Sequence, residues 1–258
     1  MTAEEEERLA RLAASWAATQ SPPIMLNRPP KPQRRYSLLK TLYQRGVNNA
    51  NIFRLDDPES LDKVRFPCFI RAENSHLFGD APKLLFDRGD IVSEMDRMKQ
   101  NGLTTYGKVL CEFEETGEEN GRYVKYSYFK VGGSLIAAHR YEGEEWFLKH
   151  YTDDYIEENP ESLLRERDFL TEQPYQTEVE MAFDIANIDY GRIDFGKRQD
   201  GGIHVYEINT NPTILHINEI HPKRRELAAP VLDAIIDAFS NLASDKHASV
   251  LHWPKRHD

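Results

Sequence analysis

The fold is decided by Tyr190-Gly-Arg-Ile-Asp-Phe-Gly196, which is followed by Val205-Tyr-Glu-Ile-Asn-Thr-Asn-Pro212. Both stretches alternate between apolar and polar residues in the manner of β-strands. Between them lies Asp200-Gly201, and an Asp-Gly pair between two alternating stretches is a strong signal for a two-residue hairpin turn. The sequence therefore predicts an antiparallel hairpin here.

The predicted hairpin gathers polar side chains on one face. A turn centred on the Asp-Gly pair places Asp194 opposite Glu207 and Arg192 opposite Asn209. Side chains alternate along a strand, so Arg192 and Asp194 share a face. By the same rule, the opposed strand presents Val205, Glu207 and Asn209 on that face. Two opposed carboxylates destabilise a sheet unless a positive charge lies between them.

Oxygen ligands of this kind suit Mg²⁺, which typically uses one or two carboxylates together with substrate phosphates. Arg192 beside such an ion is placed to hold a phosphate through a pair of N–H groups. The alternative is a polar hairpin face in contact with solvent, which is the more common fate of an Asp/Glu hairpin. The shared face, the Asp-Gly turn and the Glu-x-Asn-x-x-Pro exit together favour a binding site.

These residues resemble the metal-binding signature of the ATP-grasp superfamily, which includes D-alanine–D-alanine ligase and glutathione synthetase. The resemblance lies in Asp194, the thirteen-residue step to Glu207, and Asn209 with Pro212. It implies an α+β fold in which two lobes hold ATP between them. It also implies that Asp194, Glu207 and Asn209 ligate two Mg²⁺ ions bridging the ATP phosphates. Arg192 is then the catalytic residue, in contact with the transferred phosphate or the acyl phosphate.

Composition limits the other classes of function. The chain has 258 residues and a net charge of −10, which argues against a nucleic acid or an acidic membrane surface as the main partner. It has no apolar run of about 18 residues and therefore no expected membrane span. Cys68 and Cys111 each lie in an apolar run, so we expect buried free thiols in a cytoplasmic protein, with a disulfide as the alternative.

Three segments are expected along the chain. Residues 1–33 combine a proline-rich linker with an amphipathic helix at 4–19, whose apolar face holds Leu9, Leu12, Ala13 and Trp16. The resemblance implies that this segment is the remnant of a preceding domain. Residues 34–107 then form the first ATP-grasp lobe, and residues 108–258 the second lobe with a C-terminal helix.

Periodicity predicts the elements within these segments. The expected strands are 51–55, 66–71, 109–114 and a hairpin of 122–131 with 134–141. The expected helices are 36–45, 91–101 with Asp90 as its cap, 161–171, 176–185, and 223–243 with an interruption near Pro230.

The resemblance places candidate phosphate ligands at Arg35 and Arg71, where the family has two lysines. Arginine keeps the charge and adds a bidentate fork, although the two residues are not interchangeable. Arg35 is also readable as a surface arginine in a basic run. Arg71 ends an apolar strand, and a charge at such a position usually marks a sheet rim or a site.

Residues 110–114 resemble the hinge whose backbone recognises adenine, which makes Glu112, Phe113 and Glu114 candidate ATP contacts. Glu118, or its neighbour Glu119, is the candidate for the ribose hydroxyl groups. A strand end followed by a polar turn produces the same residues about as often.

Lys149 ends an aromatic run and is a candidate for the γ-phosphate or the substrate carboxylate; a surface lysine is the alternative. His216 and His221 follow the Asn-Pro turn and are placed to face substrate, although lone histidines are more often structural. Lys125 lies on the first strand of the 122–141 hairpin and alternates with Ser127.

The resemblance implies a Mg-ATP-dependent ligase that joins a small-molecule or peptide carboxylate to an amine or thiol through an acyl phosphate. An ATP-grasp phosphotransferase is one alternative. A non-catalytic nucleotide-binding or scaffold protein is another, favoured by the arginines at the lysine positions and by the short N-terminal segment. The complete set of Asp194, Glu207 and Asn209 favours an enzyme.

Overall fold

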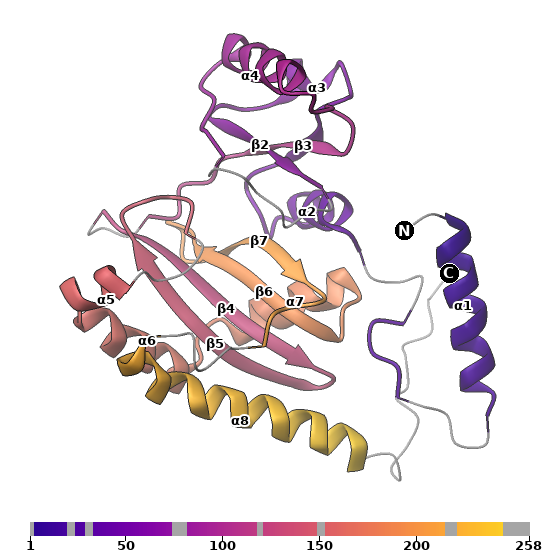
Figure 1. Cartoon of the computed structure of the whole chain (residues 1–258), viewed down its shortest axis with the longest axis vertical. Coiled ribbons are helices and arrows are strands. Elements are labelled where there is room, and N and C mark those ends of the chain that lie inside the picture. Colours follow the sequence, from indigo (N-terminus) through magenta and orange to yellow (C-terminus); the bar gives the residue numbers. More distant parts are fainter. Residues whose placement is uncertain are drawn as a thin grey trace.

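The computed structural model describes residues 3–19, 24–28, 33–73, 82–117, 121–148, 153–214 and 221–244. The elements in chain order are α1 (Ala3–Ala17), α2 (Arg35–Gln44), β1 (Ile52–Arg54), α3 (Ser60–Lys63), β2 (Cys68–Ala72), α4 (Arg88–Gln100), β3 (Lys108–Glu112), β4 (Tyr123–Val131), β5 (Ser134–Gly143), α5 (Asp153–Glu158), α6 (Glu161–Glu172), α7 (Gln176–Ala186), β6 (Tyr190–Lys197), β7 (Ile203–Asn209) and α8 (Pro222–Ser244). Antiparallel sheets combined with helices make this an α+β fold, as predicted (Figure 1). None of the described helices combines the length and the apolar character needed to cross a bilayer.

The first sheet has the order β1-β3-β2 and lies in the upper part of Figure 1. Its outer face packs against α4, where Phe53 and Leu110 meet Ile91 and Met98. β3 is the central strand, so the structure places residues 108–112 with the first sheet and not with the segment expected to begin at 108.

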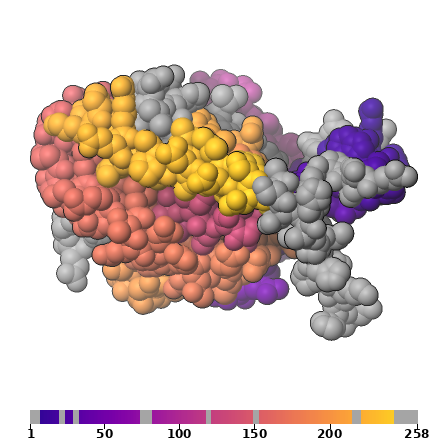
Figure 2. All heavy atoms as spheres, turned by 90° about the horizontal axis from the view of Figure 1, so that it is seen from below, coloured from indigo at the N-terminus to yellow at the C-terminus, as the bar shows by residue number. Residues whose placement is uncertain are grey.

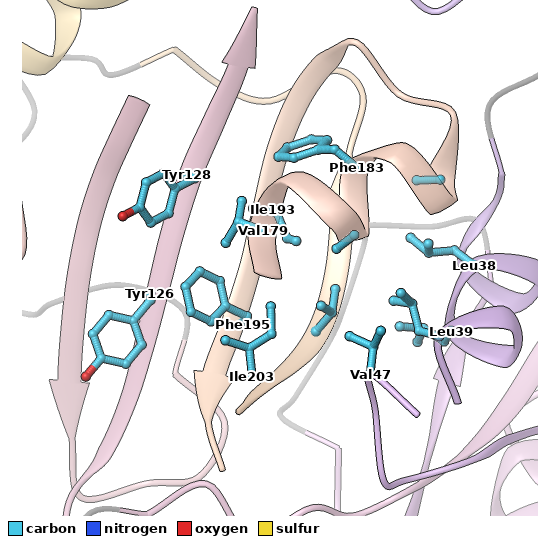
Figure 3. Close-up of a cluster of buried hydrophobic side chains, with 14 of the residues drawn as sticks. Leu38, Leu39, Val47, Tyr126, Tyr128, Val179, Phe183, Ile193, Phe195 and Ile203 are labelled. Carbon is cyan, nitrogen blue, oxygen red and sulfur yellow. The ribbon is translucent and has the colours of Figure 1, made fainter. Parts of the chain in front are cut away.

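The second sheet has the order β5-β4-β6-β7 and is covered on both faces. Tyr126 and Tyr128 of β4 point to a core with Phe195 of β6 and with Val179 and Phe183 of α7 (Figure 3). The opposite face of β4 carries Lys125, Ser127, Phe129 and Val131, because side chains alternate. α8 covers only the apolar end of that face, at Phe129 and Val131. The polar end of the face, with Lys125 and Ser127, is where the candidate functional site lies.

α2 joins the two sheets into one core. Leu38 and Leu39 of this helix pack in a single cluster with Ile52 of the first sheet and Val205 of the second. Asn48, just beyond α2, donates its side-chain amide to the Val205 carbonyl at 3.0 Å and accepts from the Val205 N–H at 2.9 Å. The Asn48 amide thus forms the same two hydrogen bonds with the edge strand β7 that a neighbouring strand would form. This pairing helps to hold the first sheet against the second.

The β6–β7 hairpin has the predicted register at the site, but its turn and its regularity differ from the expectation. The pairs Arg192–Asn209 and Asp194–Glu207 are as predicted. The turn, however, is one residue longer than the two-residue turn expected, since the Arg198 N–H binds the Gly202 carbonyl at 2.8 Å. A bulge after Asp194 then shifts the register back. The two departures cancel where the polar residues meet.

Four smaller expectations differ from the structure. The cap of α4 is Asp87, which accepts the Asp90 N–H, while Asp90 itself accepts from the N–H of Phe86. α8 continues through Pro230 as one helix, without the expected interruption. The short helices α3 and α5 were not predicted, because each is too short to show a period.

Two further expectations concern the N-terminal helix and the cysteines. α1 stands apart from the two sheets (Figures 1 and 2), and of its expected apolar face only Ala13 is buried. Leu12 and Trp16 remain largely exposed. Cys68 and Cys111 are buried free thiols, as predicted. Burial raises the pKa of Cys68 to about 12 and that of Cys111 to about 11, so both stay protonated and inert.

Candidate functional site

A cavity of about 250 Å³ lies between the two sheets, at the end of the second sheet that α8 leaves uncovered. It is lined by Phe69, Arg71, Glu112, Phe113, Glu114, Thr116, Tyr123, Val124, Lys125, Trp146, Phe147, Leu148, Arg192, Asp194, His204, Tyr206 and Glu207. One part of this lining is aromatic and the other is charged. The predicted residues Arg71, Arg192, Asp194 and Glu207 are brought together at the charged part.

The bulge in β7 shapes this lining. Tyr206 and Glu207 are consecutive in the chain, yet both line the cavity. A bulge places two residues of one strand opposite one residue of its partner, so the alternation of faces is interrupted there. Val205 consequently pairs with Phe195 in the core and is fully buried, which corrects its expected place on the face of Glu207.

Glu207 is held by two arginines from the other side of the cavity. Its Oε2 accepts from Nη2 of Arg71 at 2.9 Å and from Nη2 of Arg35. Arg71 belongs to β2 and Arg35 to α2, whereas Glu207 belongs to β7. The two predicted phosphate ligands and one predicted metal ligand therefore form a single ionic cluster that links the two sheets.

Arg35 is fixed in place more firmly than a surface arginine. Its Nη1 donates to the carbonyl groups of Ala72 at 2.8 Å and Glu73 at 3.1 Å, and its side chain is 7% exposed. Burial lowers the pKa of Arg35 and the nearby Arg71 lowers it further, while Glu207 raises it. Its Nε is buried and has no hydrogen-bond partner among the described residues. The alternative of a solvated arginine is wrong.

Asp194 is oriented by a chain of hydrogen bonds. Arg192 of the same strand donates its Nε to Oδ1 at 2.9 Å, and the Ser127 hydroxyl donates to the same oxygen at 2.7 Å. Ser127 Oγ is 2.6 Å from His139 Nε2. A hydroxyl has one proton, and here the carboxylate takes it, so the Nε2 of His139 is the donor. Burial lowers the pKa of His139 well below its usual value, which keeps the ring neutral.

Lys125 adds a further cation to the charged part of the cavity. Its Nζ donates to the carbonyl of Leu148 at 2.7 Å and lies 5.4 Å from the centre of the Tyr141 ring. Burial lowers the pKa of Lys125, and Asp194 partly offsets this effect by raising it. The carbonyl of Leu148 and the ring of Tyr141 thus hold the Lys125 amine in place at the cavity.

The aromatic part of the cavity is built around Trp146. Its ring lies 5.1 Å from that of Phe69 and 5.5 Å from that of Phe113, the latter edge to face. Across the cavity the hydroxyl groups of Thr116 and Tyr206 are 2.7 Å apart. Together these groups form an apolar slot with a polar rim.

The candidate hinge residues Glu112, Phe113 and Glu114 all line the cavity. The side chain of Glu112, however, points to the neighbouring loops and accepts from the N–H groups of Asn51 at 2.8 Å and Arg65 at 2.9 Å. It therefore holds those loops together.

The remaining candidates are distributed elsewhere. Asn209 lies opposite Arg192, and its Oδ1 accepts the N–H of Asn211 at 2.9 Å. His221 binds Glu157 at 2.9 Å and does not line the cavity. Glu118, Lys149 and His216 lie outside the described residues.

Sequence reasoning did not single out four residues that the structure brings to the site: Ser127, His139, His204 and Tyr206. Ser127 and Lys125 are two residues apart on one strand, which is a usable signal for a shared face. Tyr206 was hidden because the bulge that turns it toward the cavity has no mark in the sequence. Burial lowers the pKa of His204 to about 3, so this ring is neutral as well.

Within the described residues, no group of three or more His, Cys, Asp or Glu side chains is arranged to hold a metal ion by itself. The predicted set contains two carboxylates and one amide. Such a set suits Mg²⁺ only when substrate phosphates complete the coordination.

Comparison with known proteins finds no matching family model and no matching curated protein sequence. Among solved structures, the chain resembles a D-alanine–D-alanine ligase from Coxiella burnetii, with a TM-score of 0.49 and 17% sequence identity. The alignment includes 83% of this chain and 58% of the ligase. It also resembles an L-amino acid ligase from Bacillus licheniformis, with a TM-score of 0.45, 15% identity, and 80% of this chain covering 47% of that one.

A third similar structure is a D-alanyl-alanine synthetase A from Vibrio cholerae, with a TM-score of 0.44, 17% identity, and 81% of this chain covering 65% of that one. The chain thus spans between 47% and 65% of the length of these three proteins. All three likenesses are distant.

Proposed function

We propose that the cavity between the two sheets binds Mg-ATP and that the protein is an ATP-grasp ligase joining a carboxylate to an amine or thiol. The observation that supports this most directly is the division of one cavity into an aromatic slot and a charged part. A nucleotide has the same two parts, a flat base and a row of phosphates. Aromatic faces stack on bases, and guanidinium groups bind phosphate oxygens.

The charges at the site favour a polyanion. Arg35 and Arg71 share the carboxylate of Glu207, and Arg192 pairs with Asp194, so three guanidinium groups meet two carboxylates in these ion pairs. The buried Nε of Arg35 is a donor without an acceptor among the described residues. Arg35 itself does not line the cavity, and its guanidinium reaches the site through Glu207, which does.

The metal fits the same place. Asp194 and Asn209 supply oxygen atoms on one face of the hairpin, and Glu207 lies opposite Asp194. When bound, Mg-ATP would supply its γ-phosphoryl group to the substrate carboxylate with release of ADP, and attack by the amine or thiol on the acyl phosphate would then displace inorganic phosphate. The chain's own residues bind and orient these groups.

Arg192 has the position of the catalytic residue. Its guanidinium is held by Asp194 and therefore lies beside any phosphate on that metal site. The preorganised charge stabilises the phosphoryl group in the transition state. Ser127 binds Asp194 and is itself bound to His139, so the two side chains fix the orientation of the carboxylate.

A non-catalytic nucleotide-binding protein is the second candidate, and one observation favours it. Both Arg35 and Arg71 are already bound to Glu207, so this carboxylate is not free to serve a metal. A protein that holds a nucleotide without turning it over has no need of that ligand.

Two measurements separate these functions. Calorimetry with the non-hydrolysable analogue AMP-PNP and Mg²⁺ tests binding, and ADP release in the presence of pooled carboxylic acids, amines and thiols tests turnover. We expect binding and release for the ligase. Tight binding without release from any pool would establish the non-catalytic function, and absence of binding would overturn both.

A further inference from the structure

The contacts of Glu207 set it apart from Asp194, although the two carboxylates lie opposite each other on the hairpin. Two guanidinium groups bind a single oxygen of Glu207, its Oε2. Asp194 meets one guanidinium, that of Arg192. Each arginine carries one positive charge at any physiological pH. The cluster at Glu207 is therefore positive, whereas the Asp194–Arg192 pair is neutral.

The arginines at Glu207 are not free to leave it. Nη1 of Arg35 is bound to the carbonyl groups of Ala72 and Glu73, so the guanidinium is anchored on its far side. The side chains of Arg35 and Arg71 are 7% and 9% exposed, and that of Glu207 is 20% exposed. A group held by several bonds in a buried place does not swing away without breaking them.

Like charges keep Glu207 in its place as well. Arg35 and Arg71 bind the same oxygen of Glu207, so their like charges lie close together and the carboxylate offsets their repulsion. If Glu207 turned to a divalent ion, the two guanidinium groups would lose their shared counter-charge. The ion itself would also bring two more positive charges beside them, with twice the repulsion of a monovalent cation.

Asp194 presents the opposite case. Its Oδ1 accepts from Ser127 and Arg192, whereas Oδ2 accepts from Nη2 of Arg192 at 3.3 Å, which is a long bond. A carboxylate oxygen has two acceptor sites, so Oδ2 retains capacity for a cation. Oδ2 of Asp194 can therefore accept an ion without giving up the hydrogen bonds that hold Oδ1.

We propose that Arg35 and Arg71 take the place of one divalent ion, so that this cavity binds its nucleotide with a single metal ion on the Asp194 side. Glu207 then orients the two arginines toward the phosphates. This inference rests on the proposed nucleotide binding and differs from the expectation of two ions bridging the phosphates.

The test counts metal ions with Mn²⁺ in place of Mg²⁺. The whole protein is saturated with AMP-PNP, and electron paramagnetic resonance distinguishes an isolated Mn²⁺ from a spin-coupled pair. We expect wild-type protein to bind one isolated ion, with no coupled signal. Glu207→Gln is expected to keep that ion and Asp194→Asn to lose it. Arg97→Lys on α4, which pairs with Glu94 far from the cavity, is the matched control for arginine changes.

The converse variants restore lysine, as in the family. Arg71→Lys and Arg35→Lys each replace the guanidinium that binds Glu207 with a single amine on a shorter side chain. In the double variant we expect a second Mn²⁺ that is spin-coupled to the first. A coupled pair in the wild type would overturn the inference while leaving the proposed function intact. Loss of the ion in Glu207→Gln would overturn it too. Failure of AMP-PNP to bind with any metal would remove the proposed function and the inference together.

Discussion

A charged residue in this cavity takes its role from its immediate neighbours. Arg192 and Arg71 are both arginines at the same site, yet Arg192 is paired with a residue of its own strand and Arg71 with one of the opposite sheet. The pKa of Arg192 is raised, because burial is outweighed by the charge and hydrogen bonds of Asp194. Arg192 is thus held within its own strand, whereas Arg71 links the first sheet to the second.

Arg192→Ala is expected to reduce turnover more than nucleotide affinity. A preorganised donor acts mainly on charge that develops in the transition state, and its loss typically lowers kcat by about 10²–10³-fold. The measurement is steady-state ADP release beside calorimetry with AMP-PNP. Arg192→Lys keeps the charge without the fork and should recover part of the rate. Equal losses of affinity and turnover would reduce Arg192 to a binding residue.

Asp194→Asn is expected to weaken AMP-PNP binding in Mg²⁺ by about 10-fold or more and to have little effect in EDTA. The amide is isosteric but removes the negative charge that the ion requires. Calorimetry with and without metal makes the comparison. Asp200→Asn in the turn of the same hairpin is the control, since that carboxylate binds Arg198 outside the cavity. A matching loss in EDTA would contradict the metal role of Asp194.

The β6–β7 hairpin is the element on which the site depends. A one-residue extension of the turn and a one-residue bulge act in opposite directions on the register. Gly201 permits the longer turn, because its φ of +89° lies where side-chain-bearing residues are strained. Gly196 permits the close approach of Tyr206, whose hydroxyl would lie 2.2 Å from an added Cβ. Each glycine therefore fixes one feature of the pairing.

Gly201→Ala is expected to lower the free energy of unfolding by about 1 kcal/mol, since a left-handed backbone costs an L-residue roughly 1–2 kcal/mol. Gly133→Ala in the β4–β5 turn is the matched control. Gly133 lacks a positive φ, and an added Cβ there meets nothing within 4 Å. Urea denaturation of both variants gives the comparison. Equal stability of the two would mean that the turn at Gly201 relaxes to another conformation.

The two sheets behave as parts of one body because α2 and the Asn48 amide tie them together. Three cations, Arg71, Lys125 and Arg192, line the cavity between them, although the chain carries a net charge of −10. Long-range attraction of anions is consequently weak here, and binding depends on short contacts within the cavity. The same burial that concentrates these charges also keeps the histidine of the cavity wall neutral.

The stability of the whole molecule is expected to fall on acidification below about pH 6.5. The pKa of His204 is lowered to about 3 by burial, with Arg198 and Arg65 adding to the effect. Below pH 6.5 the unfolded chain binds a proton at this position that the folded chain does not. Each such group removes up to about 1.4 kcal/mol of stability per pH unit, and the loss ends near the folded pKa.

Denaturation between pH 8 and pH 5 tests the role of His204. His204→Gln cannot take up the proton and should show a smaller decrease of stability below pH 6.5, with no difference in slope above it. The buried Glu142, whose pKa is lowered to about 2 by arginine contacts that outweigh burial, begins to contribute only below about pH 4.5. Identical slopes in the variant and the wild type would contradict the role of His204.

Sequence patterns located most elements and the pairing of the polar residues, because alternation and turn residues act over a few positions. The pairs Arg192–Asn209 and Asp194–Glu207 came from such local rules. The bulge at Tyr206 did not, since Tyr206 there meets Thr116, a residue 90 positions away in the chain. The cap of α4 was placed at Asp90, three residues beyond the actual cap Asp87, because both carboxylates fit the pattern.

What the sequence by itself determined is the chemistry available: two carboxylates, an amide and a guanidinium on one hairpin, with two further arginines elsewhere in the chain. What only the tertiary structure decided is how these charges pair. Arg35 and Glu207 are separated by 172 positions, and no local rule brings them together. The packing of α2 between the sheets does so, because burying Leu38 and Leu39 there leaves Arg35, at the start of the helix, facing β7.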